Sequence, residues 1–420
     1  MPRARRVRLP LAIVLACGGA SEGALGVVRA LGARGVPILL VTEAADSPVA
    51  ASRHVDQVVH LPRFTRDAAS LVNAVTAVAS RQAQPPVLFP TADPDLALIA
   101  THYRELSAVL RPLVDDPALT GALMDKGRFL GLAHVHGLPV PRTHALETVI
   151  RKPGSLACPI MLKPRTPDAW HLPGLEAWLG ECKARRVDTP GELARLGPRL
   201  LDAGAATLAQ EYVPGPDEEH RDLHVFRESP ARPPVWFSGR KLRVYPVHAG
   251  SATCAISESM PDLAALGLRA LDALGYTGLA NLNFKRHADT GRFMLLEINP
   301  RVSQWNILAT RCGIDLPWCA YAAAAGLDVG PVPPGQRTGP RYVDLGADLR
   351  AWRRYRRFGE WPVLSYIGSL MSGPRVWQTF DASDPAPLLQ AFRRDLATLF
   401  RRRPRFRHPG GGGPDSLLNG

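Results

Sequence analysis

The stretch Leu295-Leu296-Glu297-Ile298-Asn299-Pro300-Arg301 places three kinds of polar group at alternate positions where an apolar strand is expected to end. Successive side chains of a strand point to opposite faces, so Glu297, Asn299 and Arg301 are expected to share one face. A carboxylate and an amide oxygen suit Mg²⁺, which takes hard oxygen ligands and shares them with nucleotide phosphates. The Arg301 guanidinium adds a rigid fork for a phosphate or a carboxylate. The segment therefore predicts a magnesium–phosphate site at the end of a strand.

A second strand precedes this one and is expected to form a hairpin with it. Asp-Thr-Gly at 289–291 is a turn signal between two alternating stretches. If the hairpin is symmetric about that turn, Asn283 lies opposite Glu297 as a cross-strand neighbour. The same register places Asn281 opposite Asn299. The alternative is a hairpin whose polar face meets water, but solvated strands more often carry Lys, Thr or Glu than this set of side chains.

The composition is that of a soluble globular protein. The chain has 420 residues, of which 46% are hydrophobic and 21% charged, and this length predicts roughly two to four domains. The net charge of +13 lies largely in arginine runs near the two ends, and aromatic residues make up only 7%. No RNA-binding signature accompanies the runs, so solvated faces and tails are the favoured interpretation. We expect no nucleic-acid partner.

The N-terminus and the cysteines bear on localisation. Six cysteines are scattered without CxxC pairs, which indicates neither a zinc site nor a disulfide framework and fits a reducing cytoplasm. Residues 3–17 imitate a signal peptide, with arginines before an apolar run. The glycine loop, helix and second apolar strand that follow favour a buried first strand instead. No other stretch approaches the ~20 apolar residues that span a bilayer, so we expect a cytoplasmic protein without stable membrane association.

The pattern along the chain changes near residue 120. Residues 9–120 alternate short apolar strands with helices, which predicts an open parallel α/β sheet. Their glycine loop, 18–23, is only a weak nucleotide-binding signal. Phe-Pro-Thr-Ala-Asp at 89–93 follows a strand end, where such sheets place ligand contacts.

The following region carries isolated lysines at ordered positions. A helix is predicted over 121–137, with Lys126 on it, and Lys163 ends an apolar strand. Residues 207–215 read as a strand that runs into a turn before an acidic trio. Residues 331–335 look like a linker, and helices are expected over 350–357 and 387–400, with a disordered tail.

This ordered set of motifs resembles the ATP-grasp superfamily. The similarity is to carboxylate–amine ligases and to the grasp domain of biotin carboxylase and carbamoyl-phosphate synthetase, and it runs from about residue 10 to 325. The resemblance implies an α/β (α+β grasp) fold. Its expected parts are an N-terminal open parallel α/β domain (1–120), an ATP-grasp domain (121–330) with a lid (about 140–205) and a core (about 206–330), and a C-terminal helical extension with a disordered tail (331–420).

The resemblance also implies a role for each matching residue. The implied roles are phosphate binding by Lys126 and Lys163; adenine contact by Gln210, Glu211, Tyr212 and Val213; ribose contact by Glu218 or Glu219; coordination of Mg²⁺ or Mn²⁺ by Glu297, Asn299 and Asn283; and catalysis at the transferred phosphoryl group by Arg301 and Lys163. Looser candidates for the lid or the acceptor pocket are Lys183 and Arg243. Residues expected to be structural or superficial are His220, His224 and His248, and those expected in the core or a pocket wall are Trp305 and Trp318.

The function that the resemblance implies is an ATP- and Mg²⁺-dependent ligase. A small-molecule carboxylate is activated as an acyl phosphate and joined to an amine; a homodimer is left open. The alternative is an ATP-binding protein with weakened catalysis and a regulatory or scaffolding role. Two departures from the family pattern bear on the choice: the first leaves open weaker metal binding, a one-metal site or a non-catalytic binder, and the second does not by itself disable catalysis. The position opposite Glu297 is usually acidic, and Asn283 lacks the charge that holds a second Mg²⁺. The lid has a Lys163-Pro164-Arg165 segment in place of the usual glycine-rich loop.

Overall fold

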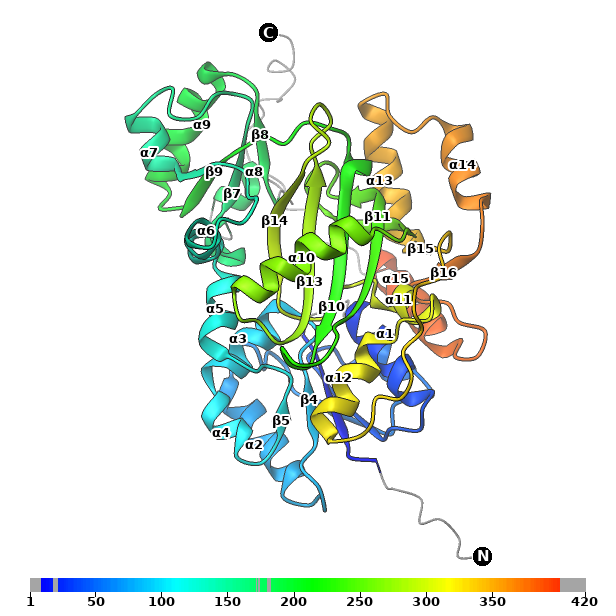
Figure 1. Cartoon of the computed structure of the whole chain (residues 1–420). Helices are drawn as coiled ribbons and strands as arrows, with labels where there is room; N and C mark the ends of the chain where they lie inside the picture. Colours follow the sequence, from blue (N-terminus) through cyan, green and yellow to red (C-terminus); the bar gives the residue numbers. More distant parts are fainter. Residues whose placement is uncertain (1–8, 18–21, 171, 173, 180–182, 401–420) are drawn as a thin grey trace, which may run out of the picture.

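Three sheets organise the computed structural model, which describes residues 9–17, 22–170, 172, 174–179 and 183–400 (Figure 1). A five-stranded sheet lies at the bottom of this view, a four-stranded sheet at the upper left, and a seven-stranded sheet in the centre. The mixture of a parallel sheet with two largely antiparallel sheets confirms the expected α/β fold class.

The N-terminal sheet has the strand order β3-β2-β1-β4-β5, and each of its pairs is parallel. Its strands are β1 (Ala12–Ala16), β2 (Ile38–Thr42), β3 (Gln57–His60), β4 (Val87–Phe89) and β5 (Arg111–Pro112), and its helices are η1 (Val49–Ala51), α1 (Glu22–Gly32), α2 (Ala68–Ala79), α3 (Asp93–Thr101) and α4 (Tyr103–Ser107). All side chains of β1 are buried, as in a parallel strand covered on both faces. The predicted first strand is therefore confirmed, whereas most of the predicted glycine loop lies outside the described residues.

The four-stranded sheet has the order β6-β9-β7-β8. Its elements are β6 (Thr143–Ala145), α7 (Leu146–Arg151), β7 (Ile160–Pro164), η2 (Pro167–Trp170), α8 (Leu175–Leu179), β8 (Arg185–Val187), α9 (Pro190–Asp202) and β9 (Thr207–Glu211). The hydroxyl of Thr189 accepts a hydrogen bond from the Glu192 amide at 3.1 Å and so caps the start of α9. The last strand of this sheet, β9, lies just past the approximate bounds expected for the lid, about 140–205, and the division into lid and core stays a prediction.

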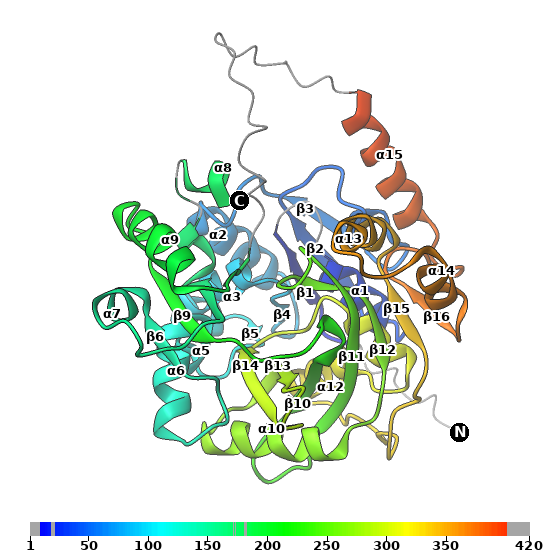
Figure 2. The same ribbon diagram turned by 90° about the horizontal axis from the view of Figure 1, so that it is seen from above.

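The seven-stranded sheet, with the order β14-β13-β10-β11-β12-β15-β16, curves around the centre of the molecule (Figure 2). Its strands are β10 (His220–Arg227), β11 (Val235–Tyr245), β12 (Ser251–Ser257), β13 (Gly278–Arg286), β14 (Phe293–Asn299), β15 (Arg341–Val343) and β16 (Arg375–Trp377), and associated helices are η3 (Asp217–Glu219), α10 (Pro261–Ala273), α11 (Asn306–Arg311) and α12 (Leu316–Ala325). Leu263 and Leu271 of α10 pack on Leu223 and Leu282 of the sheet. This face is apolar, so the polar alternate residues of β10 and β13 point to the other face.

The hairpin of β13 and β14 has the register that the sequence predicts. Asn283 pairs with Glu297, and Asn281 pairs with Asn299. The pairing shifts next to Asn283, where Leu296 is left as an extra residue of β14. Such a bulge twists the strand and re-aims its side chains.

The single helix predicted over 121–137 is wrong. The structure has α5 (Pro117–Met124) and α6 (Lys126–Val135), separated by Asp125 in an extended conformation. The Asp125 carboxylate accepts hydrogen bonds from the amides of Gly127 (2.8 Å) and Arg128 (3.0 Å). An N-cap of this kind satisfies amides that the first turn leaves unpaired, so Lys126 becomes the first residue of a new helix.

The C-terminal region is partly helical, as expected, but it also contributes β15 and β16 to the central sheet. Its helices are α13 (Leu345–Arg357), α14 (Val363–Met371) and α15 (Ala386–Phe400). The predicted disordered tail lies outside the described residues. Across the described ranges, no helix combines the length and the apolar character that crossing a bilayer requires.

A buried ion pair joins this region to the sheet. Arg243 of β11 donates two hydrogen bonds, at 2.8 and 2.7 Å, to the two carboxylate oxygens of Asp348 on α13, and both side chains are fully buried. A third hydrogen bond, at 2.7 Å, goes to the hydroxyl of Ser369. Arg243 therefore does not line a lid or acceptor pocket, and the suggestion that it does is wrong.

Breaking this pair is expected to destabilise the fold. Arg243→Met leaves the Asp348 carboxylate buried without its cation, which should cost about 3–5 kcal/mol and lower the urea midpoint of unfolding. The matched control is Arg240→Met on the same strand, whose partner Glu258 is 43% exposed; an exposed pair contributes about 0–1 kcal/mol. Equal shifts of the urea midpoint in the two variants would contradict this account of Arg243.

Candidate active site

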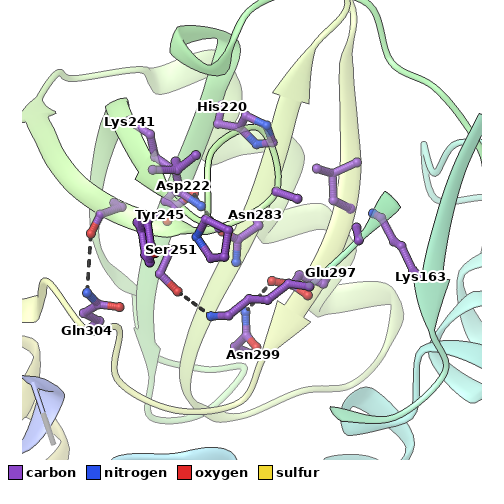
Figure 3. Close-up of a pocket in the computed structure, with 18 of the residues that line it drawn as sticks. Lys163, His220, Asp222, Lys241, Tyr245, Ser251, Asn283, Glu297, Asn299 and Gln304 are labelled. Carbon is purple, nitrogen blue, oxygen red and sulfur yellow. Dashed lines mark hydrogen bonds and ion pairs between the residues drawn. The ribbon is translucent and has the colours of Figure 1, made fainter. Parts of the chain in front are cut away.

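A cavity of about 1120 Å³ lies where the three sheets meet. Figure 3 shows side chains from the central sheet turned toward it and Lys163 approaching from the four-stranded sheet. Predicted site residues that line the cavity are Lys126, Lys163, Lys183, Gln210, Glu211, Tyr212, Val213, Asn283, Glu297, Asn299 and Arg301. The fold thus brings together residues that are far apart in the sequence: Lys126 and Arg301, which line the same cavity, are separated by 175 positions.

Glu297 is the carboxylate of the hairpin in this cavity. Burial opposes its ionisation, but Lys126 and Lys163 outweigh burial and lower the pKa of the Glu297 carboxyl below its ordinary value. Asn299 donates a hydrogen bond through Nδ2 to Oε1 of Glu297 at 3.2 Å, which leaves the amide oxygen of Asn299 as a donor for a cation. The carboxylate is therefore charged and is available for a metal ion.

The set of oxygen donors fits Mg²⁺. Glu297 supplies a carboxylate and Asn299 an amide oxygen, and these hard ligands typically leave positions for water and phosphate. Oδ1 of Asn283 also faces the cavity, but it accepts a hydrogen bond from Lys241 Nζ at 2.8 Å, so its role as a metal ligand stays a prediction. Oδ1 of Asn281, on the same face of β13, is buried and accepts no hydrogen bond from the described part of the chain. A buried polar atom of this kind usually has a partner, and a ligand in the cavity can supply one.

Lys163 is held by the strand next to it. It lies on β7, where Ile160 and Leu162 point into the hydrophobic core of the four-stranded sheet and the alternate residues point to the cavity. Its Nζ donates to Oε1 of Gln210 at 2.7 Å. Burial lowers the pKa of Lys163 to about 8, and Glu297 partly opposes that shift.

The segment from Gln210 to Val213 forms one wall of the cavity. Two cations contact the ring of Tyr212: the Arg186 guanidinium is 4.3 Å from the ring centroid, and Lys285 Nζ is 4.9 Å away. Glu211 pairs with Arg142 at 3.3 Å at the edge of the cavity. These side-chain contacts fix the wall beside the cavity.

Arg301 connects the central sheet to the N-terminal domain. Its Nε is 2.6 Å from a carboxylate oxygen of Asp93, which follows the strand end highlighted in the sequence. Burial disfavours the charged form of Arg301, but Asp93 outweighs burial and raises the pKa of the guanidinium above its ordinary value. Thr91 and Ala92 line the cavity beside Asp93, so the N-terminal domain forms this end of the site.

The acidic trio lies mostly elsewhere. Glu219 pairs with Arg286 at 2.7 Å and with Arg221 at 3.5 Å. Neither Glu218 nor Glu219 lines the cavity. Their role as ribose ligands therefore stays a prediction without support from the geometry.

Several polar residues of the cavity were missed or misjudged from sequence. Those missed are Asp222, Lys241 and Lys285, and those expected to be structural or superficial but found lining the cavity are His220 and His248. Alternation along β13 could have found Lys285, because it shares a face with Asn283. His224 fits its expected structural role, since its ring centroid lies 4.5 Å from that of Trp305 in a buried cluster. Trp305 forms pocket wall as expected.

Lys183 reaches the cavity from the four-stranded sheet's side of the molecule. Its Nζ donates to the hydroxyl of Ser251 on β12 at 3.0 Å. This hydrogen bond joins the segment before β8 to the central sheet across the cavity.

Comparisons with known proteins agree with these observations. The family described as "ATP-grasp in the biosynthetic pathway with Ter operon" matches residues 244–344. A D-aspartate ligase of Enterococcus faecium is 26% identical over 231 residues, which cover 52% of this chain and 54% of that protein. The N-terminal section of the carbamoyl phosphate synthase large chain of Methanopyrus kandleri is also 26% identical over 231 residues, covering 52% of this chain and 38% of that protein. The match thus spans about half or less of each relative's length.

Solved structures resemble the chain over a larger part of its length. The biotin carboxylase domain of Hydrogenobacter thermophilus 2-oxoglutarate carboxylase, in complex with MgADP, ADP and bicarbonate, has a TM-score of 0.61 at 14% identity and covers 79% of this chain and 73% of that one. An L-amino acid ligase from Bacillus licheniformis has a TM-score of 0.58 at 14% identity and covers 78% of each chain. At such low identity these likenesses establish a shared fold.

The pKa of Lys163 predicts how nucleotide binding depends on pH. The ammonium form attracts phosphates, so the affinity for ATP should fall as pH rises through about 8, where free Lys163 loses its proton. Lys163→Arg keeps its charge throughout this range and should remove that fall. The measurement is calorimetric ATP binding at pH values on either side of the transition. The same loss of affinity in both proteins would show that another group titrates.

Proposed function

Because the chain is an ATP-grasp protein that resembles carboxylate–amine ligases, we propose that it is a ligase that uses ATP and Mg²⁺ to join a small-molecule carboxylate to an amine. The observation that carries the proposal is the ionised Glu297, flanked by Lys126 and Lys163, in a cavity at the junction of three sheets. The cavity volume of about 1120 Å³ exceeds the ~300–1,000 Å³ of ordinary single-ligand pockets, which suits a nucleotide and a second substrate.

Binding uses groups from both sides of the cavity. Lys126 and Lys163 hold the phosphates, and the wall from Gln210 to Val213 contacts the base. Glu297 and Asn299 would hold Mg²⁺, which when bound offsets phosphate charge and orients the transferred group. The lysines come from the helix α6 and the strand β7, whereas the metal ligands come from the central sheet.

The first chemical step transfers the γ-phosphoryl group to the carboxylate. A carboxylate oxygen bonds to the γ-phosphorus, the bond to the β-bridging oxygen breaks, and ADP leaves with that electron pair. Charge spreads over the transferred oxygens, so catalysis rests on positioning and neutralisation. Lys163 and Arg301 supply that positive charge. Asp93 holds the Arg301 fork and thereby acts as a positioning residue.

The second step forms the amide. The amine nitrogen attacks the acyl carbon, phosphate leaves, and the nitrogen gives up its extra proton. Water competes with the amine for an acyl phosphate, so a closed cavity is required during this step. The Lys183–Ser251 contact, which joins the two sides of the cavity, is suited to hold such a closed state.

The alternative function is an ATP-binding protein with weakened catalysis, in a regulatory or scaffolding role. The observation that favours it is Asn283, which faces Glu297 in the register of β13 and β14 without contributing a charge. Such a protein binds ATP but does not hydrolyse or transfer its γ-phosphoryl group, whichever carboxylate and amine are supplied.

The proposal is tested by ADP release. The purified chain is screened with amino acids and small dicarboxylates, with hydroxylamine as the trapping amine. A ligase forms ADP only when its carboxylate is present, and hydroxylamine converts the acyl phosphate to a hydroxamate. ADP release that does not depend on any carboxylate, with no hydroxamate, contradicts the proposal.

Glu297 should be indispensable for that turnover. Glu297→Gln keeps the size of the side chain but removes the charge that holds Mg²⁺, so kcat/KM should fall by about a hundredfold or more, roughly 2.7 kcal/mol. Glu258→Gln is the matched control, because Glu258 pairs with Arg240 outside the cavity. Equal activities of the two variants would remove Glu297 from the proposed metal site.

Asn283→Asp separates the ligase from the alternative. If the chain is a ligase, the wild-type protein already turns over ATP with its own substrates and does not need the substitution. A wild type that binds ATP without turnover, together with an Asn283→Asp variant that gains turnover, would support the weakened ATP-binding protein instead. Both proteins are assayed for ADP release and for ATP binding under the same conditions.

A further inference from the structure

Four polar side chains form a row across four neighbouring strands of the central sheet. The strand order β14-β13-β10-β11 places Glu297, Asn283, Asp222 and Lys241 side by side. Asn283 pairs with Glu297 on one side and with Asp222 on the other. Asp222 also pairs with Gly239, and Lys241 lies two residues further along that strand, on the same face.

Lys241 is tightly held within this row. Its Nζ donates to Oδ1 of Asn283 at 2.8 Å and lies 3.2 Å from a carboxylate oxygen of Asp222. The Asp222 and Lys241 side chains are only 1% and 10% exposed, and Figure 3 shows Lys241 and Asp222 close together above Asn283. Asp222 and Lys241 are opposite charges that are both buried, so removing either residue would leave the other charge uncompensated. The Lys241 ammonium is therefore fixed in position.

This arrangement bears on the number of metal ions. The amide of Asn283 has no charge to hold a divalent cation, and its oxygen already accepts a hydrogen bond from an ammonium group. The row contains two carboxylates and one ammonium, so Lys241 neutralises one of the acidic groups. What remains is the charge of Glu297, which suits one divalent cation shared with phosphate oxygens.

We propose that the Lys241 ammonium takes the place of a second divalent cation, so that the chain binds one Mg²⁺ per nucleotide. This inference rests on the proposed ATP-dependent function and deepens it. Asp222 is the positioning residue that holds Lys241 in the row. Asparagine at 283 is then the matched partner of a lysine, because an acidic residue there would compete with Asp222 for the ammonium and would attract another metal ion.

The test counts metal ions rather than turnover. Mn²⁺ is titrated by electron paramagnetic resonance into the chain bound to a non-hydrolysable ATP analogue. The wild type should hold one tightly bound Mn²⁺ per nucleotide. The double variant Lys241→Met/Asn283→Asp should hold two, because Asp222 and the new carboxylate are then free to bind a cation. The control Lys285→Met, which removes a lysine of the same cavity outside the row, should still hold one.

Two Mn²⁺ in the wild-type complex would overturn the inference by itself, whatever the variants do. A double variant that binds the analogue with a single Mn²⁺ would also overturn it. The proposed function fails in a different way: the wild type would then bind no ATP analogue in calorimetry, with or without metal. The two failures are therefore distinguishable.

Discussion

The site depends on keeping one carboxylate charged inside a cavity. Glu297 lines the cavity, and its burial there would by itself favour the neutral form. It stays ionised because Lys126, from the helix after Asp125, and Lys163, from the four-stranded sheet, converge on it. Neither lysine is close to Glu297 in the sequence, so the electrostatics of the site exist only when the separate parts of the chain are assembled.

The central sheet makes this assembly possible by separating two kinds of side chain. Leu282 and Phe284 of β13 pack into the core with α10, whereas Asn281 and Asn283 point to the cavity. The same division holds on β10, where Leu223 packs into the core and Asp222 lines the cavity. A buried apolar face fixes the register, because a slip of one residue would exchange the two faces. Packing on one side of the sheet therefore fixes the chemistry on the other.

The parts of the site that sequence could predict are those set by local pattern. Alternation and a turn signal predict which residues of β13 and β14 face each other, and the structure confirms that register. The role of Lys163, which ends an apolar strand, follows from the resemblance to the ATP-grasp superfamily and not from the local pattern alone. The apolar pattern does not predict the helix boundary at Asp125, where the carboxylate accepts hydrogen bonds from the amides of Gly127 and Arg128 and so begins a new helix.

Contacts between strands distant in sequence were not predictable in the same way. Asp222 and Lys241 carry no motif of their own, and their closeness to Asn283 follows from the order β13-β10-β11. Arg243 was misjudged for the same reason, since its partner Asp348 lies 105 residues further along the chain. In both cases an ionisable side chain on a strand has a role that depends on which element covers it.

In the proposed reaction a carboxylate takes the γ-phosphoryl group of ATP before an amine replaces the phosphate. Its most direct test uses the accepted carboxylate labelled with ¹⁸O, followed by mass analysis of the inorganic phosphate released. Transfer through an acyl phosphate predicts one carboxylate-derived ¹⁸O atom in each phosphate, because the oxygen that attacked phosphorus leaves with it. Phosphate that carries no label, formed in the presence of both substrates, would show that water attacks ATP and would contradict the account.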